Sequence, residues 1–185
     1  MQGLIILDKP AGMTSFSAVA NVKRIFSEKR VGHTGTLDPM ATGVLPILLG
    51  RATRLCELML HADKRYTAEI LLGKTTDTLD ITGETLTETE CDISLLDFDK
   101  ACNNFRGEIS QVPPMYSALK VDGQKLCDLA RKGKEVERKP RPITIHELTC
   151  LRFDGETARL RVRCSKGTYI RTLCKDIAQA LGCGG

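Results

Sequence analysis

The run from Gly32 to Pro46 constrains the fold more than any other part of the chain. It reads GHTGTLDPMATGVLP and holds one acid, Asp38, among residues that, His33 apart, are small, apolar or hydroxylated. Its glycines permit sharp turns, and Pro39 biases Asp38 away from helical geometry. The run therefore predicts a rigid loop that presents one carboxylate. Because an Asp before Pro is most often a turn former, these residues alone leave both a structural and a catalytic role open.

The composition of the 185-residue chain, with 42% hydrophobic and 27% charged residues, is that of an ordinary folded protein with one sizeable core. The net charge of +4 favours binding to a polyanion without demonstrating it. No stretch approaches the ~18 apolar residues of a membrane span, and Met1-Gln2-Gly3 leads directly into a strand-like segment. We therefore expect a cytoplasmic protein without a membrane span or a signal peptide.

The cysteines and histidines form no metal-binding pattern. None of the eight cysteines belongs to a Cys-x-x-Cys pair, and several occupy apolar positions of helical or alternating segments. They are typical of reduced cysteines in a cytosolic core. The three histidines are scattered without metal-ligand spacing, so the sequence predicts no zinc site.

Hydrophobic periodicity and capping residues predict both strands and helices. A strand over residues 4–7 leads through a Lys-Pro-Ala-Gly turn to a helix over residues 16–28, which Thr14 or Ser15 can cap. This order favours an α/β or α+β core. The same criteria predict strands over 66–72 and 157–165, and helices over 52–61, 95–106, 123–132 and 168–181, the last ended by Gly182.

Two segments concentrate positive charge. In the strand over 157–165, Leu160, Val162 and Cys164 alternate with three arginines, which favours a half-buried strand with a solvated face over a direct RNA contact. From Arg131 to Pro142 the chain has six basic residues, two acids and two prolines, which predicts a loop. Because charge runs are usually solvated, an RNA-binding role for this loop stays open.

The run 32–46 resembles the signature of the TruB family of tRNA pseudouridine synthases, and five further blocks resemble that family in the same order. They are GLIILDKPAGMTS at 3–15, KRY at 64–66, TDTLD at 76–80, QVPPMYSALK at 111–120 and CSKGTYIRTL at 164–173. The resemblance implies an α+β pseudouridine synthase fold with one mixed, bent sheet, flanking helices and a central RNA-binding cleft. It also implies that the loop over 131–142 is mobile and contacts RNA.

The resemblance implies isomerisation of the T-loop uridine at tRNA position 55 to pseudouridine. The segment 41–51 and the short N-terminus look like the bacterial stand-alone branch of the family. The reaction breaks the N1–C1′ bond, rotates the base and rejoins it through C5, with no redox change. We expect the partner to be tRNA, through its T-stem loop, and the protein to be a monomer without a cofactor or a metal.

The resemblance assigns the nucleophile to Asp38, because a carboxylate can act covalently without a cofactor. The motif leaves open whether Asp38 attacks the sugar carbon, attacks the base or begins by removing a sugar proton. Burial in a nucleobase pocket would raise the pKa of this acid, whereas a cation within a few Å lowers an acid's pKa by ~1–3 units. Arg171 matches the family's arginine partner of the catalytic aspartate, so we expect an ion pair between Arg171 and Asp38.

Further residues match the family's substrate pocket. A base that is turned out of its stack loses stacking free energy, which contacts in the pocket must replace. Stacking of the base on the ring of Tyr66 would contribute ~1–3 kcal/mol. Tyr169 is expected to line the same site and His33 to enter the space near the flipped base. The resemblance also suggests that Asp80 orients pocket groups and that Lys9 supports the catalytic loop.

Two other functions compete with this one. A non-catalytic tRNA-binding or tRNA-folding module would use the basic surface and Tyr66 but would not need Asp38. Aspartyl-phosphate chemistry at Asp8, which follows a strand, lacks a second metal-binding acid nearby and leaves the run 32–46 unexplained.

Family members continue beyond a segment like 182–185 into the last catalytic elements and a PUA domain, so we expect residues 1–185 to lack both and to be less stable and less active alone.

Overall fold

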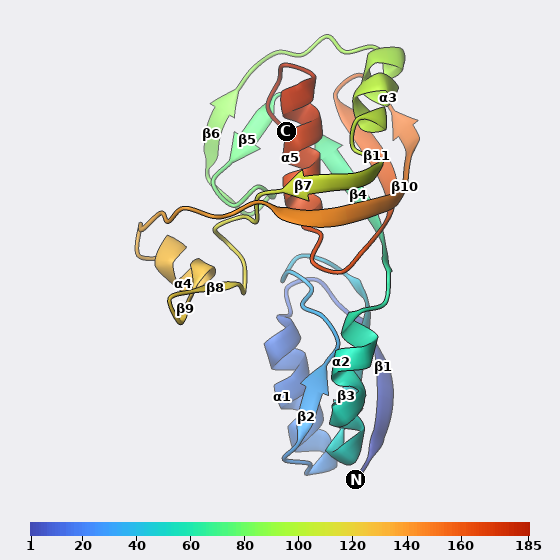
Figure 1. The fold of residues 1–185 in the computed structure, drawn as a ribbon, viewed down its shortest axis with the longest axis vertical. Helices are drawn as coiled ribbons and strands as arrows, with labels where there is room; N and C mark the ends of the chain where they lie inside the picture. Colours follow the sequence, from blue (N-terminus) through green and yellow to red (C-terminus); the bar gives the residue numbers. More distant parts are fainter. The chain divides into compact units, whose positions relative to one another are not determined.

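The computed structural model describes residues 1–185, and the chain divides into two units. The N-terminal unit is Met1–Ala62 and the C-terminal unit is Asp63–Gly185. Figure 1 labels the elements of both. No helix is long and apolar enough to cross a membrane.

A three-stranded sheet and one long helix build the N-terminal unit. Its elements are β1 (Gly3–Lys9), α1 (Ser15–Phe26), β2 (Val31–His33), β3 (Gly43–Leu49), the 3-10 helix η1 (Gly50–Leu55) and α2 (Cys56–Leu60). β3 lies between β1 and β2 and is antiparallel to both. Ala18 and Val22 of α1 pack against Leu45, Ile47 and Leu49 of β3. This core fixes the strand ends from which the loop over 34–42 leaves the sheet.

Local chemistry sets the limits of α1. The hydroxyl of Thr14 accepts a hydrogen bond from the backbone N–H of Ser17 and so caps the helix. Ser27 ends the helix in the left-handed region at φ 47°. The predicted cap and start are therefore confirmed, and the helix ends two residues before the predicted Glu28.

The C-terminal unit has a four-stranded antiparallel sheet ordered β4-β11-β10-β7 and two small hairpins. Its elements are β4 (Lys64–Leu71), β5 (Lys74–Thr76), β6 (Thr85–Glu88), α3 (Leu95–Asn103), β7 (Gly107–Gln111), β8 (Lys120–Val121), β9 (Gln124–Lys125), α4 (Leu126–Ala130), β10 (Arg141–Phe153), β11 (Thr157–Cys164) and α5 (Ile170–Ala180). Phe98 of α3 and Leu173 and Ile177 of α5 pack with Leu160 and Val162 of β11 in one core. The helices α3 and α5 thus supply the apolar cover of this sheet (Figure 1).

The α+β class is confirmed, but the expectation of one mixed sheet is wrong. Strands lie in four separate sheets, and every strand pair is antiparallel. The physical reason is visible in the N-terminal unit, where α1 connects β1 to β2. These two strands run in the same direction, yet β3 inserts between them and pairs with both, so no parallel ladder forms.

Several predicted elements differ in extent. The helix expected over 52–61 is a 3-10 segment followed by a short α-helix, and that expected over 123–132 is the β8–β9 hairpin followed by five helical residues. The prediction missed β3, because Pro46 within it argues against a central strand. Pro46 faces Ile6 of β1, and its carbonyl accepts the Thr34 N–H at 3.2 Å. By contrast, the alternation over 157–165 is confirmed, with Leu160, Val162 and Cys164 fully buried.

Candidate active site

The loop that carries Asp38 is held by a buried ammonium group. Lys9, the last residue of β1, has no exposed surface, and its Nζ donates to the carbonyls of Met13 (2.7 Å), Pro10 (2.9 Å) and Pro39 (3.1 Å). An ammonium group has three donors, so these carbonyls match its full capacity. Alternation along β1 explains why Lys9 points inward, since Ile5 and Leu7 on the same face pack into the core. Lys9 therefore contacts the loop that carries Asp38, and its expected role at the site stays a prediction.

A second contact fixes the residue before Asp38. The hydroxyl of Ser15, the first residue of α1, accepts from the Leu37 N–H at 3.0 Å and donates to the Leu37 carbonyl at 3.2 Å. Ser15 is only 2% exposed. The Gly12 N–H donates to the Pro39 carbonyl at 2.9 Å. The backbone is thus held on both sides of Asp38 by the segment between β1 and α1.

Electrostatics within this unit link Lys9 to Asp38. Burial lowers the pKa of Lys9 from its ordinary value, and the negative charge of Asp38 acts in the opposite direction. Asp38 itself is half-buried, and its carbonyl accepts the Ala41 N–H at 3.0 Å in a tight turn. The unit therefore holds a carboxylate on a fixed turn beside a buried cation whose own donors are already engaged by carbonyls.

His33 lies at the end of β2, just before the loop. Its Nδ1 accepts the Gly35 N–H at 3.3 Å, and the side chain is half-buried. This contact requires an unprotonated Nδ1, because a protonated nitrogen cannot accept a hydrogen bond. His33 thus helps to shape the start of the Asp38 loop while its ring remains partly accessible.

Arg171 lies in the first turn of α5 and is held by distant segments of the C-terminal unit. Its Nη1 donates to the Thr78 carbonyl at 2.7 Å and its Nη2 to the Tyr116 carbonyl at 2.9 Å. The Asp80 carboxylate lies 3.9 Å from Nη1, and both side chains are about 15% exposed or less. The guanidinium is therefore positioned by two segments, 78–80 and Tyr116, that are far from Arg171 in sequence.

Asp80 is itself fixed by a tight turn between β5 and β6. Its Oδ1 accepts from the Thr78 hydroxyl and the Thr82 N–H, each at 2.9 Å, and from the Thr82 hydroxyl. Burial opposes ionisation of Asp80, but these hydrogen bonds and the charge of Arg171 together hold its pKa below the ordinary value. The turn requires Gly83, because a Cβ there would collide with the side chains of Thr78 and Asp77. Asp80 thus faces Arg171 as an ionised carboxylate.

Gln111 is a positioning residue that the sequence analysis missed. It ends β7, is 2% exposed, and pairs with the backbone of Tyr169. Its side-chain oxygen accepts the Tyr169 N–H at 2.9 Å, and its amide nitrogen donates to the Tyr169 carbonyl at 3.1 Å. Tyr169 is the N-cap residue of α5 and makes no side-chain cap bond. The signal available in the sequence was a polar side chain at the end of a strand, immediately before Val-Pro-Pro.

Tyr66 lies in β4, opposite Val162 of β11, and packs against the core of the C-terminal unit. Its side chain is half-buried, as is that of Tyr169.

The structure therefore brings together Arg171, Asp80 and the Tyr169 backbone in one unit, and Asp38, Lys9 and His33 in the other. The expected pair of Asp38 with Arg171 joins residues of different units and stays a prediction. No group of three His, Cys, Asp or Glu side chains is arranged to hold a metal ion.

Comparison with known proteins identifies the family. Residues 23–170 match the family model described as TruB family pseudouridylate synthase (N terminal domain). The proteins named tRNA pseudouridine synthase B from Pseudomonas fluorescens (strain Pf0-1) and Azoarcus sp. (strain BH72) are 53% and 50% identical to this chain over 184 residues. Each alignment covers 100% of this chain but only 60% and 61% of the relative. The chain thus spans about three fifths of the length of these relatives.

Solved structures agree with the sequence match. A crystal structure of a Cbf5-Nop10-Gar1 complex contains a chain with a TM-score of 0.75 and 34% identity, over 98% of this chain and 45% of that one. An H/ACA RNP bound to a substrate RNA containing 2'-deoxyuridine gives a TM-score of 0.72 and 31% identity, over 98% and 44%. The family model covers most of the chain, and the blocks around Asp38 and Arg171 lie within it or at its edge. The chain therefore belongs to the TruB family of pseudouridylate synthases.

Proposed function

We propose that this chain carries the catalytic centre of an enzyme that converts uridine to pseudouridine in tRNA, at the T-loop uridine of position 55. The observation that carries the proposal is the fixed turn around Asp38. Lys9, Gly12 and Ser15 bind the backbone on both sides of this one acid. A module that only binds RNA needs no carboxylate held in this way, and the relatives named tRNA pseudouridine synthase B support the tRNA substrate.

The proposed chemistry divides between the two units. Asp38 supplies the carboxylate that initiates cleavage of the N1–C1′ bond, and Arg171 pairs with it so that it stays ionised when the base excludes water. The Asp80 carboxylate and the Thr78 and Tyr116 carbonyls hold the guanidinium in place. Tyr66 and Tyr169 stack on and line the flipped uracil, and His33 lies beside it.

The proposed setting follows from the substrate. The T-stem loop is the part of the tRNA that enters the site, and the protein acts as a monomer in the cytoplasm, where tRNA is modified. The loop over 131–142 contacts phosphates. Residues 131–140 form no strand or helix, as expected, whereas Arg141 and Pro142 already belong to β10. The basic residues of the segment are largely exposed, although Arg138 donates to the Pro113 carbonyl at 3.2 Å.

The experiment compares the chain with its Asp38→Asn variant on a tRNA transcript labelled with tritium at uridine C5. Pseudouridine formation releases this tritium. We expect release by the parent chain and a loss of at least ~10³-fold in the variant, because the nucleophile is removed while side-chain size is kept. The affinity for tRNA should stay nearly the same. Substantial release by purified Asp38→Asn protein would refute the assignment of Asp38, and tRNA binding without any release by either protein would favour the binding module.

A further inference from the structure

Positive charge is unevenly distributed between the two units. The N-terminal unit has seven Lys and Arg residues against four Asp and Glu, a net charge of +3, whereas the C-terminal unit has twenty against nineteen. One of the seven cations, Lys9, is buried in the Asp38 loop. The remaining six are exposed and come from the end of α1, the turn before β2, and η1; they are Lys23, Arg24, Lys29, Arg30, Arg51 and Arg54. We call these six residues the basic end.

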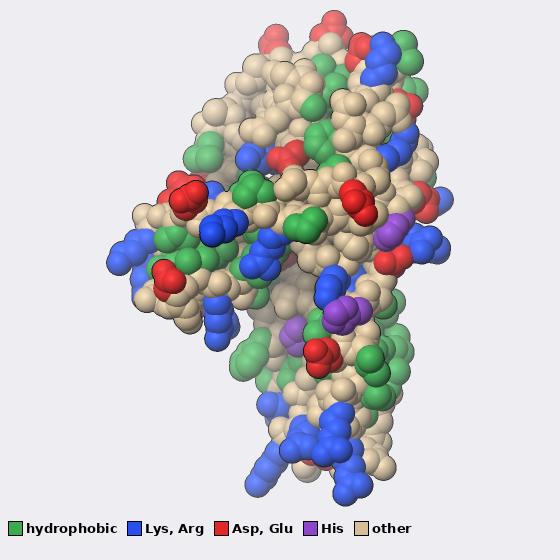
Figure 2. Space-filling model, in the orientation of Figure 1, with side chains coloured by type: hydrophobic (Ala, Val, Ile, Leu, Met, Phe, Trp, Pro, Cys, Tyr) green, Lys and Arg blue, Asp and Glu red, His purple; other side chains and the backbone are tan.

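The basic end is at the side of the sheet where the N-terminus lies, and Figure 2 shows Lys and Arg side chains gathered there. A backbone hydrogen bond from the Gly50 N–H to the Arg30 carbonyl, at 2.7 Å, holds the turn before β2 beside the start of η1. The residues Met1, Gln2, Glu28, Arg30, Gly50 and Arg51 line an open pocket of about 440 Å³ at this point. Two arginines from separate segments thus border one cavity.

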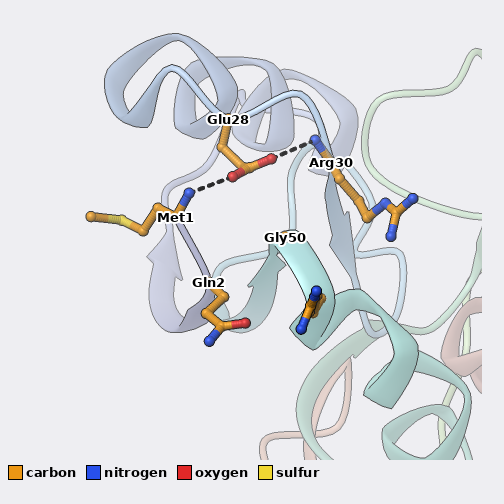
Figure 3. A pocket seen from close by; sticks show the side chains of 6 residues that line it. Met1, Gln2, Glu28, Arg30 and Gly50 are labelled. Atoms are coloured by element: carbon orange, nitrogen blue, oxygen red, sulfur yellow. Dashed lines mark hydrogen bonds and ion pairs between the residues drawn. The ribbon is translucent and has the colours of Figure 1, made fainter.

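Glu28, the acidic side chain that lines this pocket, already accepts hydrogen bonds from within the protein. The Glu28 carboxylate accepts from the Met1 amine at 2.6 Å and from the Arg30 backbone N–H at 3.1 Å. Figure 3 shows Glu28 between these two nitrogens, with the Arg30 side chain extending away from it. None of the six side chains of the basic end forms an ion pair within the protein. Their charges are therefore available to an external anion.

We propose that the basic end binds backbone phosphates of the RNA substrate, with Arg30 and Arg51 as the principal contacts. The inference rests on the proposed function for the identity of the ligand. Planar guanidinium groups bind phosphate oxygens in a bidentate manner, and a cluster of six exposed cations without ion pairs suits contacts to the RNA backbone.

The sheet of the N-terminal unit sets the distance between this contact and Asp38. β1 begins beside the pocket at Gly3 and ends at Lys9, which holds the Asp38 loop, and β3 returns from Gly43 to Leu49. Seven strand residues at ~3.3 Å each span roughly 20 Å. The basic end therefore contacts RNA about that far from the reacting uridine, outside the loop that enters the active site.

The test compares Arg30→Gln/Arg51→Gln with a control that also loses two exposed charges, Lys100→Gln/Arg152→Gln. Lys100 and Arg152 are 64% and 77% exposed and lie in the C-terminal unit. Two RNA probes are used over a series of KCl concentrations, a full-length unmodified tRNA transcript and a hairpin limited to the T loop and its adjacent base pairs. Both variants should melt at the parent temperature, since all four side chains are exposed.

We expect Arg30→Gln/Arg51→Gln to bind full-length tRNA about 5- to 30-fold more weakly. The slope of log affinity against log salt should fall by about 1.5, as for two lost phosphate contacts. Hairpin affinity and the turnover of saturating RNA should stay at the parent level, because the hairpin ends before the basic end. The control should lose less than about 2-fold with either probe.

Three outcomes would count against the phosphate contact or against the proposed catalytic function. Equal affinity and salt slope of the two variants for full-length tRNA would overturn the inference. An equal loss for the hairpin would also overturn it, because the contact would then lie near the loop. If the parent chain makes no pseudouridine but the selective loss is still seen, the basic end is an RNA-binding surface and the proposed catalytic function fails instead.

Discussion

The two units fix their proposed site residues in different ways. In the N-terminal unit, the hydrogen bonds that hold the backbone around Asp38 come from Lys9, Gly12 and Ser15, at most 30 positions away. In the C-terminal unit, Arg171 is held by Thr78 and Tyr116, which are 93 and 55 positions away. The first arrangement is a local motif, whereas the second depends on the whole unit being folded. Substitutions should therefore separate activity from stability in one unit and couple them in the other.

Within the C-terminal unit, the largest effect is expected for Arg171→Ala. Removal of the guanidinium leaves Asp80 and two carbonyls without their partner, so the unit should lose about 3 kcal/mol of unfolding free energy. We expect turnover to fall at least ~100-fold in the tritium-release assay. Arg171→Lys should recover only part of either quantity, because an ammonium group lacks the planar fork. Full activity of the lysine variant would show that charge alone suffices.

Gln111→Leu tests whether the start of α5 is set from β7. The variant removes the side-chain oxygen that accepts the Tyr169 N–H, which should lower the free energy of unfolding by about 2 kcal/mol, measured in urea. Turnover should fall roughly tenfold together with stability, because Arg171 follows two residues later. Gln111→Glu retains an acceptor for the N–H and should be less destabilised. A loss of activity without a loss of stability would contradict the coupling expected in this unit.

Ser15→Ala, in the N-terminal unit, should lower activity with little loss of stability, unlike the variants of the C-terminal unit. It removes both hydrogen bonds to Leu37, next to Asp38, at a cost of only about 1 kcal/mol. We expect kcat to fall about tenfold with KM unchanged, since the carboxylate is displaced but the RNA contacts remain. The matched control is Ser17→Ala, which loses only an exposed contact with Thr14. Ser15→Thr should restore turnover, and a purely structural role would instead lower stability without this kinetic split.

The smallest expected effect is the contribution of Asp80 to the pH dependence of the free energy of unfolding. Its pKa is depressed in the folded state, so its ionisation stabilises the protein above the unfolded pKa of about 3.9, and this contribution disappears as pH falls through the folded value. Asp80→Asn should therefore be less stable than the parent at pH 7, with the difference shrinking below about pH 4. Urea unfolding at several pH values measures it. A difference independent of pH would assign the effect to packing.

Sequence patterns predicted what depends on local chemistry. The cap at Thr14 and the buried face of β11 both follow from residues near one another in the chain. The antiparallel sheets did not follow, because pairing of β3 with β1 and β2 joins segments whose order along the chain suggested a parallel crossover. Gln111 escaped prediction for the same reason, since its partner Tyr169 lies 58 positions away. The roles assigned to Asp38, Arg171, Tyr66 and His33 came from family resemblance and stay predictions.

The buried ammonium of Lys9 also bears on how the N-terminal unit opens. Because Lys9 is part of the β1–β3 ladder and binds the Pro39 carbonyl, the turn around Asp38 cannot be ordered while β1 is detached. The amides of Gly12, Leu37 and Ala41 should then exchange with solvent deuterium at the rate at which β1 separates from β3, as one cooperative unit. The turn around Asp38 thus has the lifetime of a core strand rather than that of a surface loop.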